Sequence, residues 1–120
     1  MSKKTIVIGS SENPERYSYI AVMKLHNFGH EVVPVGVKAG KIGPYEILTG
    51  KPAVTGVDTV SLYVGPKNQA EWYDYVLGLN PKRIIFNPGT ENPEFEKRAQ
   101  EKGIEALEAC TLVMLSVGTY

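Results

Sequence analysis

The stretch Thr5-Ile6-Val7-Ile8-Gly9-Ser10-Ser11-Glu12-Asn13-Pro14-Glu15-Arg16-Tyr17 decides the fold. Its apolar, β-branched run from Thr5 to Ile8 predicts a buried strand. Asn13-Pro14 indicates the start of a helix, with Asn13 as the cap and Pro14 at the first helical position. A strand that passes into a helix through a turn of small residues presents free N–H groups and the positive end of the helix dipole to an anion. The stretch therefore predicts a phosphate-bearing nucleotide at this turn.

The length and composition of the chain set its class. The 120 residues predict a single domain, residues 1–120, and the 42% of apolar residues are enough for a hydrophobic core. Thirteen basic and thirteen acidic residues give no net charge, which argues against nucleic acid and a membrane surface as partners. A single cysteine, Cys110, excludes an internal disulfide and a cysteine-based zinc cluster, and we expect no metal. No signal peptide or membrane-spanning run is seen, so a cytoplasmic protein is expected.

Predicted strands and helices alternate along the chain. Strands are expected at 4–9, 31–35, 58–64, 83–86 and 104–109, and helices at 14–28, 68–79 and 92–102. The segment 36–57 is expected to be irregular, with one short strand near Ala53-Val54, and residues 112–115 to form a final short turn. Apolar strands joined by helices predict an α/β fold: a Rossmann-like, doubly wound three-layer sandwich with a mainly parallel five-stranded sheet.

In such folds ligands bind beyond the carboxyl ends of the strands. The turns at these ends are Gly9-Ser10-Ser11, Gly36-Val37-Lys38, Gly65-Pro66, Asn87-Pro88-Gly89 and the segment at Cys110. Four of these five turns are rich in small residues. Glycine and proline form turns in most proteins, but several such turns at one sheet edge favour a crevice lined by backbone.

The type of nucleotide depends on what the chain carries after its second strand. The sequence has neither the Gly-x-Gly-x-x-Gly pattern of dinucleotide binders nor a Walker motif. Proteins that bind NAD usually carry an acidic residue at the end of the second strand, whereas this chain has Lys38, with Lys41 nearby. Because a lysine pairs with a ribose phosphate, coenzyme A and NADP fit better than NAD, although both lysines could also be solvated residues of a loop.

Four motifs follow one another along the chain: Gly9-Ser10-Ser11-Glu12-Asn13-Pro14-Glu15-Arg16-Tyr17-Ser18, Glu31-Val32-Val33-Pro34-Val35-Gly36-Val37-Lys38, Asn87-Pro88-Gly89-Thr90-Glu91-Asn92 and Glu108-Ala109-Cys110. In this order they resemble the motifs of the small bacterial CoA-binding domain proteins, whose fold is shared with the CoA-binding domain of succinyl-CoA synthetase. The chain departs from the family at Ser10, where alanine is usual, and at Gly36-Val37, where Asn-Pro is usual. Its loop 39–51 looks longer than that of the family.

The resemblance implies roles for individual residues. The pyrophosphate would lie over Ser10, Ser11 and the helix start, with Arg16 adding charge and Ser18 a hydroxyl, and Lys38 would approach the ribose phosphate. The expected cofactor-binding residues are Gly9, Ser10, Ser11, Asn13, Pro14, Arg16, Tyr17, Ser18, Gly36, Val37, Lys38, Gly65, Pro66, Asn87, Pro88 and Gly89.

No catalytic group is apparent in the sequence. His26 and His30 flank the end of the first helix, at the edge opposite to the predicted crevice. Cys110 is interpreted as a small buried hydrophobe, with a reactive thiol facing the CoA thiol as the alternative. We therefore expect non-catalytic binding of coenzyme A or an acyl-CoA, by a carrier, a sensor or a partner subunit that forms a homodimer or joins another protein. The alternatives are an NADP-dependent reductase, or a subunit of one, and an interaction subunit with a vestigial site.

Overall fold

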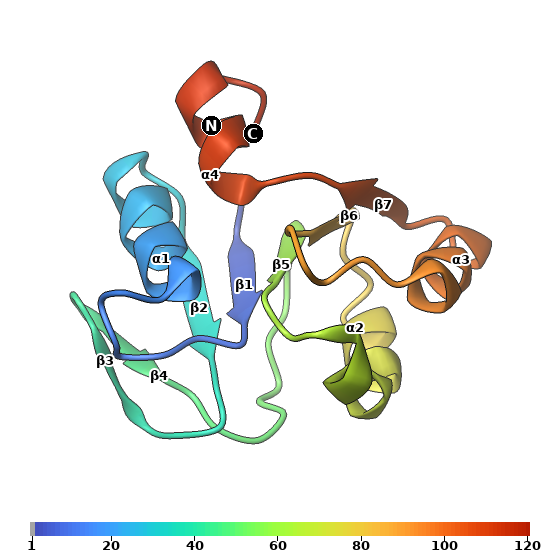
Figure 1. The fold of residues 1–120 in the computed structure, drawn as a ribbon, viewed down its shortest axis with the longest axis horizontal. Coiled ribbons are helices and arrows are strands. Elements are labelled where there is room, and N and C mark those ends of the chain that lie inside the picture. The colour runs from blue at the N-terminus through green and yellow to red at the C-terminus, as the bar shows by residue number, and fades with distance from the viewer. Residues whose placement is uncertain (1) are drawn as a thin grey trace.

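A computed structural model describes residues 2–120 and contains a parallel five-stranded sheet (Figure 1). The strand order is β2-β1-β5-β6-β7, and every neighbouring pair is parallel. The strands are β1 (Thr5–Ile8), β2 (Val32–Val35), β5 (Thr59–Leu62), β6 (Arg83–Phe86) and β7 (Glu105–Glu108). All five lie within the ranges predicted from sequence, and the Rossmann-like α/β fold is confirmed.

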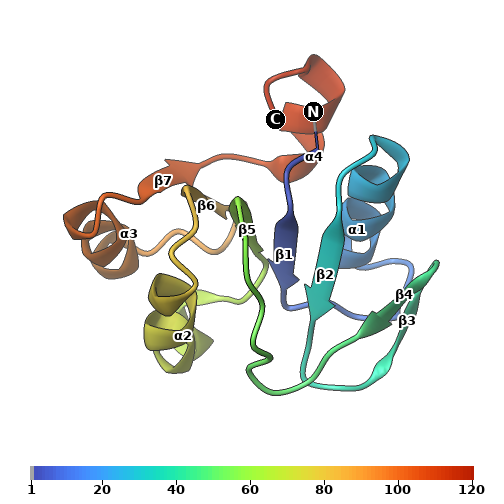
Figure 2. The same ribbon diagram turned by 180° about the vertical axis from the view of Figure 1, so that it is seen from behind.

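Helices cover both faces of the sheet, as the two opposite views show (Figures 1 and 2). Along β1, Ile6 and Ile8 pack into one core cluster with Val76 and Phe95, while Val7 packs into a second with Leu25. The first cluster lies under α2 (Tyr73–Gly78), α3 (Pro93–Glu101) and the 3-10 turns η1 (Pro66–Asn68) and η2 (Ala70–Trp72), and the second under α1 (Tyr17–Asn27) and α4 (Thr111–Val117). Because β1 is buried on both faces, its sequence is continuously apolar.

A two-stranded hairpin in the segment 36–57 was not predicted. It consists of β3 (Gly40–Ile42) and β4 (Tyr45–Ile47), which pair antiparallel across the turn Gly43-Pro44. The chain then rejoins the end of β2, where Leu48 bridges to Val35. Ile42 and Ile47 are buried in the cluster beneath α1. The prediction of a strand near Ala53-Val54 was wrong, because residues 51–55 form no regular element.

Three helix boundaries differ from the prediction. The first helix begins at Tyr17 instead of Pro14, because Asn13 forms a turn in which its Oδ1 accepts from the Glu15 N–H at 3.0 Å. The expected helix at 68–79 is divided into η1, η2 and the six-residue α2. The expected short turn at 112–115 is the seven-residue helix α4.

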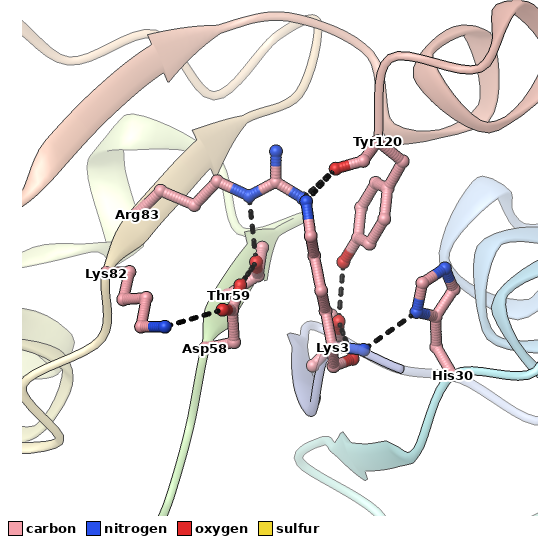
Figure 3. A network of polar contacts seen from close by, with 8 residues as sticks. Lys3, His30, Asp58, Thr59, Lys82, Arg83 and Tyr120 are labelled. Atoms are coloured by element: carbon pink, nitrogen blue, oxygen red, sulfur yellow. Dashed lines mark hydrogen bonds and ion pairs between the residues drawn. The ribbon is translucent and has the colours of Figure 1, made fainter. Parts of the chain in front are cut away.

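A polar network fastens the C-terminal segment across the amino edge of the sheet (Figure 3). Arg83 donates from Nε to Thr59 Oγ1 and from Nη2 to the Tyr120 carbonyl, both at 2.8 Å. The Tyr120 ring lies under the Arg83 guanidinium, and its hydroxyl contacts Thr5 Oγ1. The Lys3 N–H donates to His30 Nδ1 at 3.0 Å. The network thus holds His30 at the amino edge of the sheet, opposite to the carboxyl ends of the strands.

Candidate ligand site at the carboxyl edge

Two glycines allow the turns after β1, β2 and β5 to meet. Gly9 has φ +93°, and a Cβ atom there would lie 2.9 Å from the Tyr63 carbonyl oxygen. A Cβ atom on Gly36 would lie 2.3 Å from the Ser10 carbonyl oxygen. Neither position has room for a side chain, so the close approach of these turns requires glycine at both.

The Ser10 side chain builds the turn and does not face the crevice. Its Oγ donates to the Val7 carbonyl at 2.8 Å, and its N–H donates to the Val35 carbonyl at 2.9 Å. Ser11, which is half-buried, accepts from the Asn13 N–H through Oγ at 3.1 Å. The donors of Ser10 thus have partners inside the fold, and the position of a pyrophosphate over this turn stays a prediction.

The start of α1 offers free donors to an anion. Arg16 is the N-cap residue and makes no capping hydrogen bond with its side chain, and the first turn contains no acidic residue. The first N–H groups of a helix have no partner within it, and they carry the positive end of its dipole. Arg16 and Ser18 line a pocket of about 230 Å³ at this helix end, which we call the middle pocket. Its other lining residues are Gly9, Tyr17, Tyr63, Gly65, Pro88, Gly89 and Thr90.

A second pocket, of about 350 Å³, adjoins the middle pocket at Gly9 and extends toward β2. We call it the β2-side pocket. Val37, which is 91% exposed, forms one of its walls, and the buried ring of Trp72 another. Its remaining lining residues are Gly36, Val64, Asn68 and Glu71.

A third pocket, of about 290 Å³, lies toward the start of α4. Three of its lining residues, Tyr17, Tyr63 and Pro88, also line the middle pocket, and the other two are Cys110 and Leu112. None of the five is an acidic or basic residue. We call this space the apolar pocket. The three pockets form a continuous crevice that crosses the carboxyl edge from β2 to α4.

Buried amide side chains hold the turns around the crevice. Asn87, at the end of β6, donates to Ser61 Oγ at 3.0 Å and to the Leu62 carbonyl at 2.9 Å, and its Oδ1 accepts from the Thr111 N–H at 2.8 Å. Gln69 donates to the carbonyls of Val64 and Thr90, at 2.8 and 2.7 Å. Asn87 is fully buried, and its side chain holds these turns in position.

The Tyr63 ring is a wall of the crevice, whereas its hydroxyl is enclosed. Within residues 2–120 the hydroxyl has no hydrogen-bond partner and almost no accessible surface. Burial raises the pKa of this hydroxyl well above its usual range, and the nearby Cys110 raises it further. Tyr63 is therefore neutral, and it presents the ring to the crevice.

The predicted residues fall into two groups. Gly9, Arg16, Tyr17, Ser18, Gly36, Val37, Gly65, Pro88 and Gly89 line the pockets. Outside the pocket linings are Ser10, Ser11, Asn13, Pro14, Lys38, Pro66 and Asn87. Lys38 is an exposed residue of the turn that follows Gly36 and Val37.

Sequence reasoning missed Tyr63, Trp72, Thr90 and Leu112 as residues of the crevice. The third strand was predicted to extend to Val64 but ends at Leu62, so the crevice begins earlier than expected. Because Tyr63 and Val64 prolong the apolar run, the sequence hides this strand end. Trp72 was assigned, as an alternative to Tyr75, to a partner surface, although its place after a proline-started turn beyond the third strand is a usable signal for the crevice.

Comparison with known proteins places the chain in a family. The CoA binding domain family matches residues 3–116, and the chain therefore belongs to this family. A crystal structure of an uncharacterized protein is 49% identical, with a TM-score of 0.98, over 100% of this chain and 99% of that one.

Two further structures share the fold. A protein from Thermus thermophilus is 24% identical, with a TM-score of 0.86 over 99% of this chain and 91% of its own. A hypothetical protein from Pyrococcus horikoshii OT3 is 26% identical, also with a TM-score of 0.86, over 97% of this chain and 83% of its own. No match was found among proteins with curated functions. Within residues 2–120, none of the helices has the length and apolar character to cross a membrane.

Proposed function

We propose that this protein binds coenzyme A or an acyl-CoA in the crevice at the carboxyl edge of the sheet. The observation that carries the proposal is the uncapped start of α1, where Arg16 and Ser18 line the middle pocket. A pyrophosphate there would meet the free N–H groups of the helix and the Arg16 guanidinium. Membership of the CoA binding domain family supports coenzyme A as the nucleotide.

The β2-side pocket suits the adenosine end of the ligand. The walls of this pocket, Val37 and Trp72, give a base apolar surface to pack against. Lys38 follows Val37 directly and is exposed, so it would be the nearest cation to a phosphate on a ribose bound at Val37. Coenzyme A carries such a phosphate, whereas NAD does not, so Lys38 favours the former.

A direct titration tests this proposal. Isothermal calorimetry with coenzyme A, dephospho-CoA, NADP and NAD should give the tightest binding for coenzyme A and none for NAD. Arg16→Gln should weaken coenzyme A binding, whereas Arg98→Gln, on the exposed surface of α3, should not. NAD binding as tight as that of coenzyme A, or equal effects of the two substitutions, would contradict the proposal.

We further propose that the protein binds its ligand without chemistry. Both histidines are remote from the crevice: His26 contacts Tyr45 in the hairpin at 2.9 Å, and His30 accepts from Lys3. The Tyr63 hydroxyl is enclosed. Among the side chains in the apolar pocket, the Cys110 thiol is the strongest nucleophile.

Intact-mass measurement tests this second proposal. After incubation with acetyl-CoA, and separately with the disulfide of coenzyme A, we expect the mass of the protein to be unchanged. A rapid gain of one acetyl group, or of one coenzyme A in a mixed disulfide, that disappears in Cys110→Ser would refute non-catalytic binding.

A further inference from the structure

We propose that the apolar pocket holds the acyl group of a short-chain acyl-CoA, and that the acyl thioester is the preferred form of the ligand. The inference rests on the proposed function, because it assigns the end of the same ligand. Its basis is the order of the three pockets along the sheet and the chemistry of the third.

The order of the pockets matches the order of groups in an acyl-CoA. The β2-side pocket is lined from β2, β1 and the turns after β5, and the middle pocket from α1 and the turns after β5 and β6. The apolar pocket adds Cys110 and Leu112, which follow β7. The β2-side pocket shares Gly9 with the middle pocket, and the middle pocket shares Tyr17, Tyr63 and Pro88 with the apolar pocket. Leu112 lies beside α1, where its carbonyl accepts from Lys24 Nζ at 3.3 Å. A ligand with adenosine near Val37 and its pyrophosphate near Arg16 would therefore direct its thiol end toward Leu112.

The lining of the apolar pocket selects against a polar occupant. Two aromatic rings, a proline, a leucine and a thiol form its walls. The hydroxyl of Tyr63 has almost no accessible surface, so it offers no exposed polar atom to the space. A charged or strongly polar group placed there would lose water without gaining partners. An alkyl chain loses nothing on entering, and each buried methylene gains affinity.

The size of the apolar pocket limits the chain that it accepts. Its volume is about 290 Å³, and a water molecule, similar in size to a methylene group, occupies roughly 30 Å³ of liquid. Because the pocket opens to the middle pocket, part of this space belongs to the thioester and the adjoining arm of coenzyme A. We therefore infer acyl chains of about four to six carbons.

An affinity series measured on the wild-type protein tests the assignment. Titrations with coenzyme A, acetyl-CoA, butyryl-CoA, hexanoyl-CoA and decanoyl-CoA should give affinities that rise by up to about fourfold per methylene and then level off. If neither coenzyme A nor any of the acyl-CoA esters binds, the proposed function is wrong. If coenzyme A binds but the affinities do not rise with chain length, only the acyl assignment fails.

A pair of neighbouring substitutions locates the acyl group. Leu112→Trp should fill the pocket and bring the affinity ratio of butyryl-CoA to coenzyme A close to one. Val113→Trp, at a position 56% exposed and outside the pocket lining, should keep the wild-type ratio. Circular dichroism checks that both variants fold. If Leu112→Trp does not fold, Leu112→Asn replaces it; this substitution should lower the affinity ratio of butyryl-CoA to coenzyme A, because it makes the wall of the pocket polar. An unchanged ratio in a folded Leu112 variant would overturn the proposal.

Discussion

A negative charge at Ser18 gives the sharpest test of where the pyrophosphate lies. Ser18 is in the first turn of α1, is 4% exposed and lines the middle pocket. The substitution Ser18→Asp places a carboxylate in the first turn, where the helix dipole contributes about 0.3–1 kcal/mol and offsets part of the cost of a charge at a buried position. The same carboxylate would face a bound phosphate.

The loss of affinity follows from Coulomb's law. Two like charges 4 Å apart repel by about 1 kcal/mol in water and by about 4 kcal/mol near a protein surface. The middle pocket is partly open, so a value on the order of 2 kcal/mol is appropriate, which is roughly a thirtyfold loss of affinity. Ser18→Asn introduces a side chain of nearly the same shape without the charge, and it should cost much less.

Calorimetric titration with coenzyme A at two salt concentrations measures this effect. The difference between the aspartate and asparagine variants should shrink as salt screens the pair, and thermal melts should show both variants folded. Equal losses in the two variants would mean that the effect is steric. Unchanged binding in the aspartate variant would show that the phosphates do not lie at the start of α1.

Three further substitutions test other parts of the structure. Lys38→Ala should weaken the binding of coenzyme A by about 0.2–1 kcal/mol and the binding of dephospho-CoA by less. Equal losses of affinity for the two ligands on calorimetry would show that Lys38 does not bind the ribose phosphate. Tyr63→Phe removes a buried hydroxyl that has no hydrogen-bond partner within residues 2–120, so urea unfolding should show a gain in stability of about 1 kcal/mol. A loss of stability would mean that the hydroxyl has a partner. Burial, aided by the charge of Lys3, holds the pKa of His30 below its ordinary value of 6.5. As the pH is lowered, His30 therefore binds its proton in the unfolded chain before it does so in the folded protein. The free energy of unfolding consequently falls as the pH drops below 6.5. His30→Gln should lessen that fall, and an unchanged pH profile would contradict the assignment.

Local sequence signals predicted the order of the elements but not every boundary, as two Asn-Pro pairs show. At Asn92-Pro93 the expected helix start is present, and Asn92 Oδ1 accepts from the Phe95 N–H at 3.2 Å. At Asn13-Pro14 the same signal gives a turn. The difference lies in packing: Phe95 is fully buried, whereas residues 12–17 are all exposed. A first turn without tertiary contacts gains little from being helical.

The hairpin was missed for a related reason. Gly43-Pro44 is a two-residue connection, and Gly43 has φ +56°, but the strands on either side have only three residues each. Such strands are too short to show an alternating pattern in the sequence. Their stability comes from Ile42 and Ile47, which pack in the cluster beneath α1. That contact depends on the tertiary fold, so the sequence pattern does not reveal it.

Asn87 shows why the sequence indicates where strands end but not which way the side chains at those ends point. Sequence position correctly put this residue at the end of a strand, but an asparagine there can face a ligand or bond to the backbone. Here its amide joins Ser61 and Leu62, at the end of β5, to the Thr111 N–H at the start of α4. Since Tyr63 follows Leu62 and Leu112 follows Thr111, one buried amide fixes the relative position of the middle and apolar pockets. Asn87→Asp keeps the oxygen that accepts from the Thr111 N–H but loses the N–H groups that donate to Ser61 and Leu62. The substitution should therefore lower the free energy of unfolding of the protein.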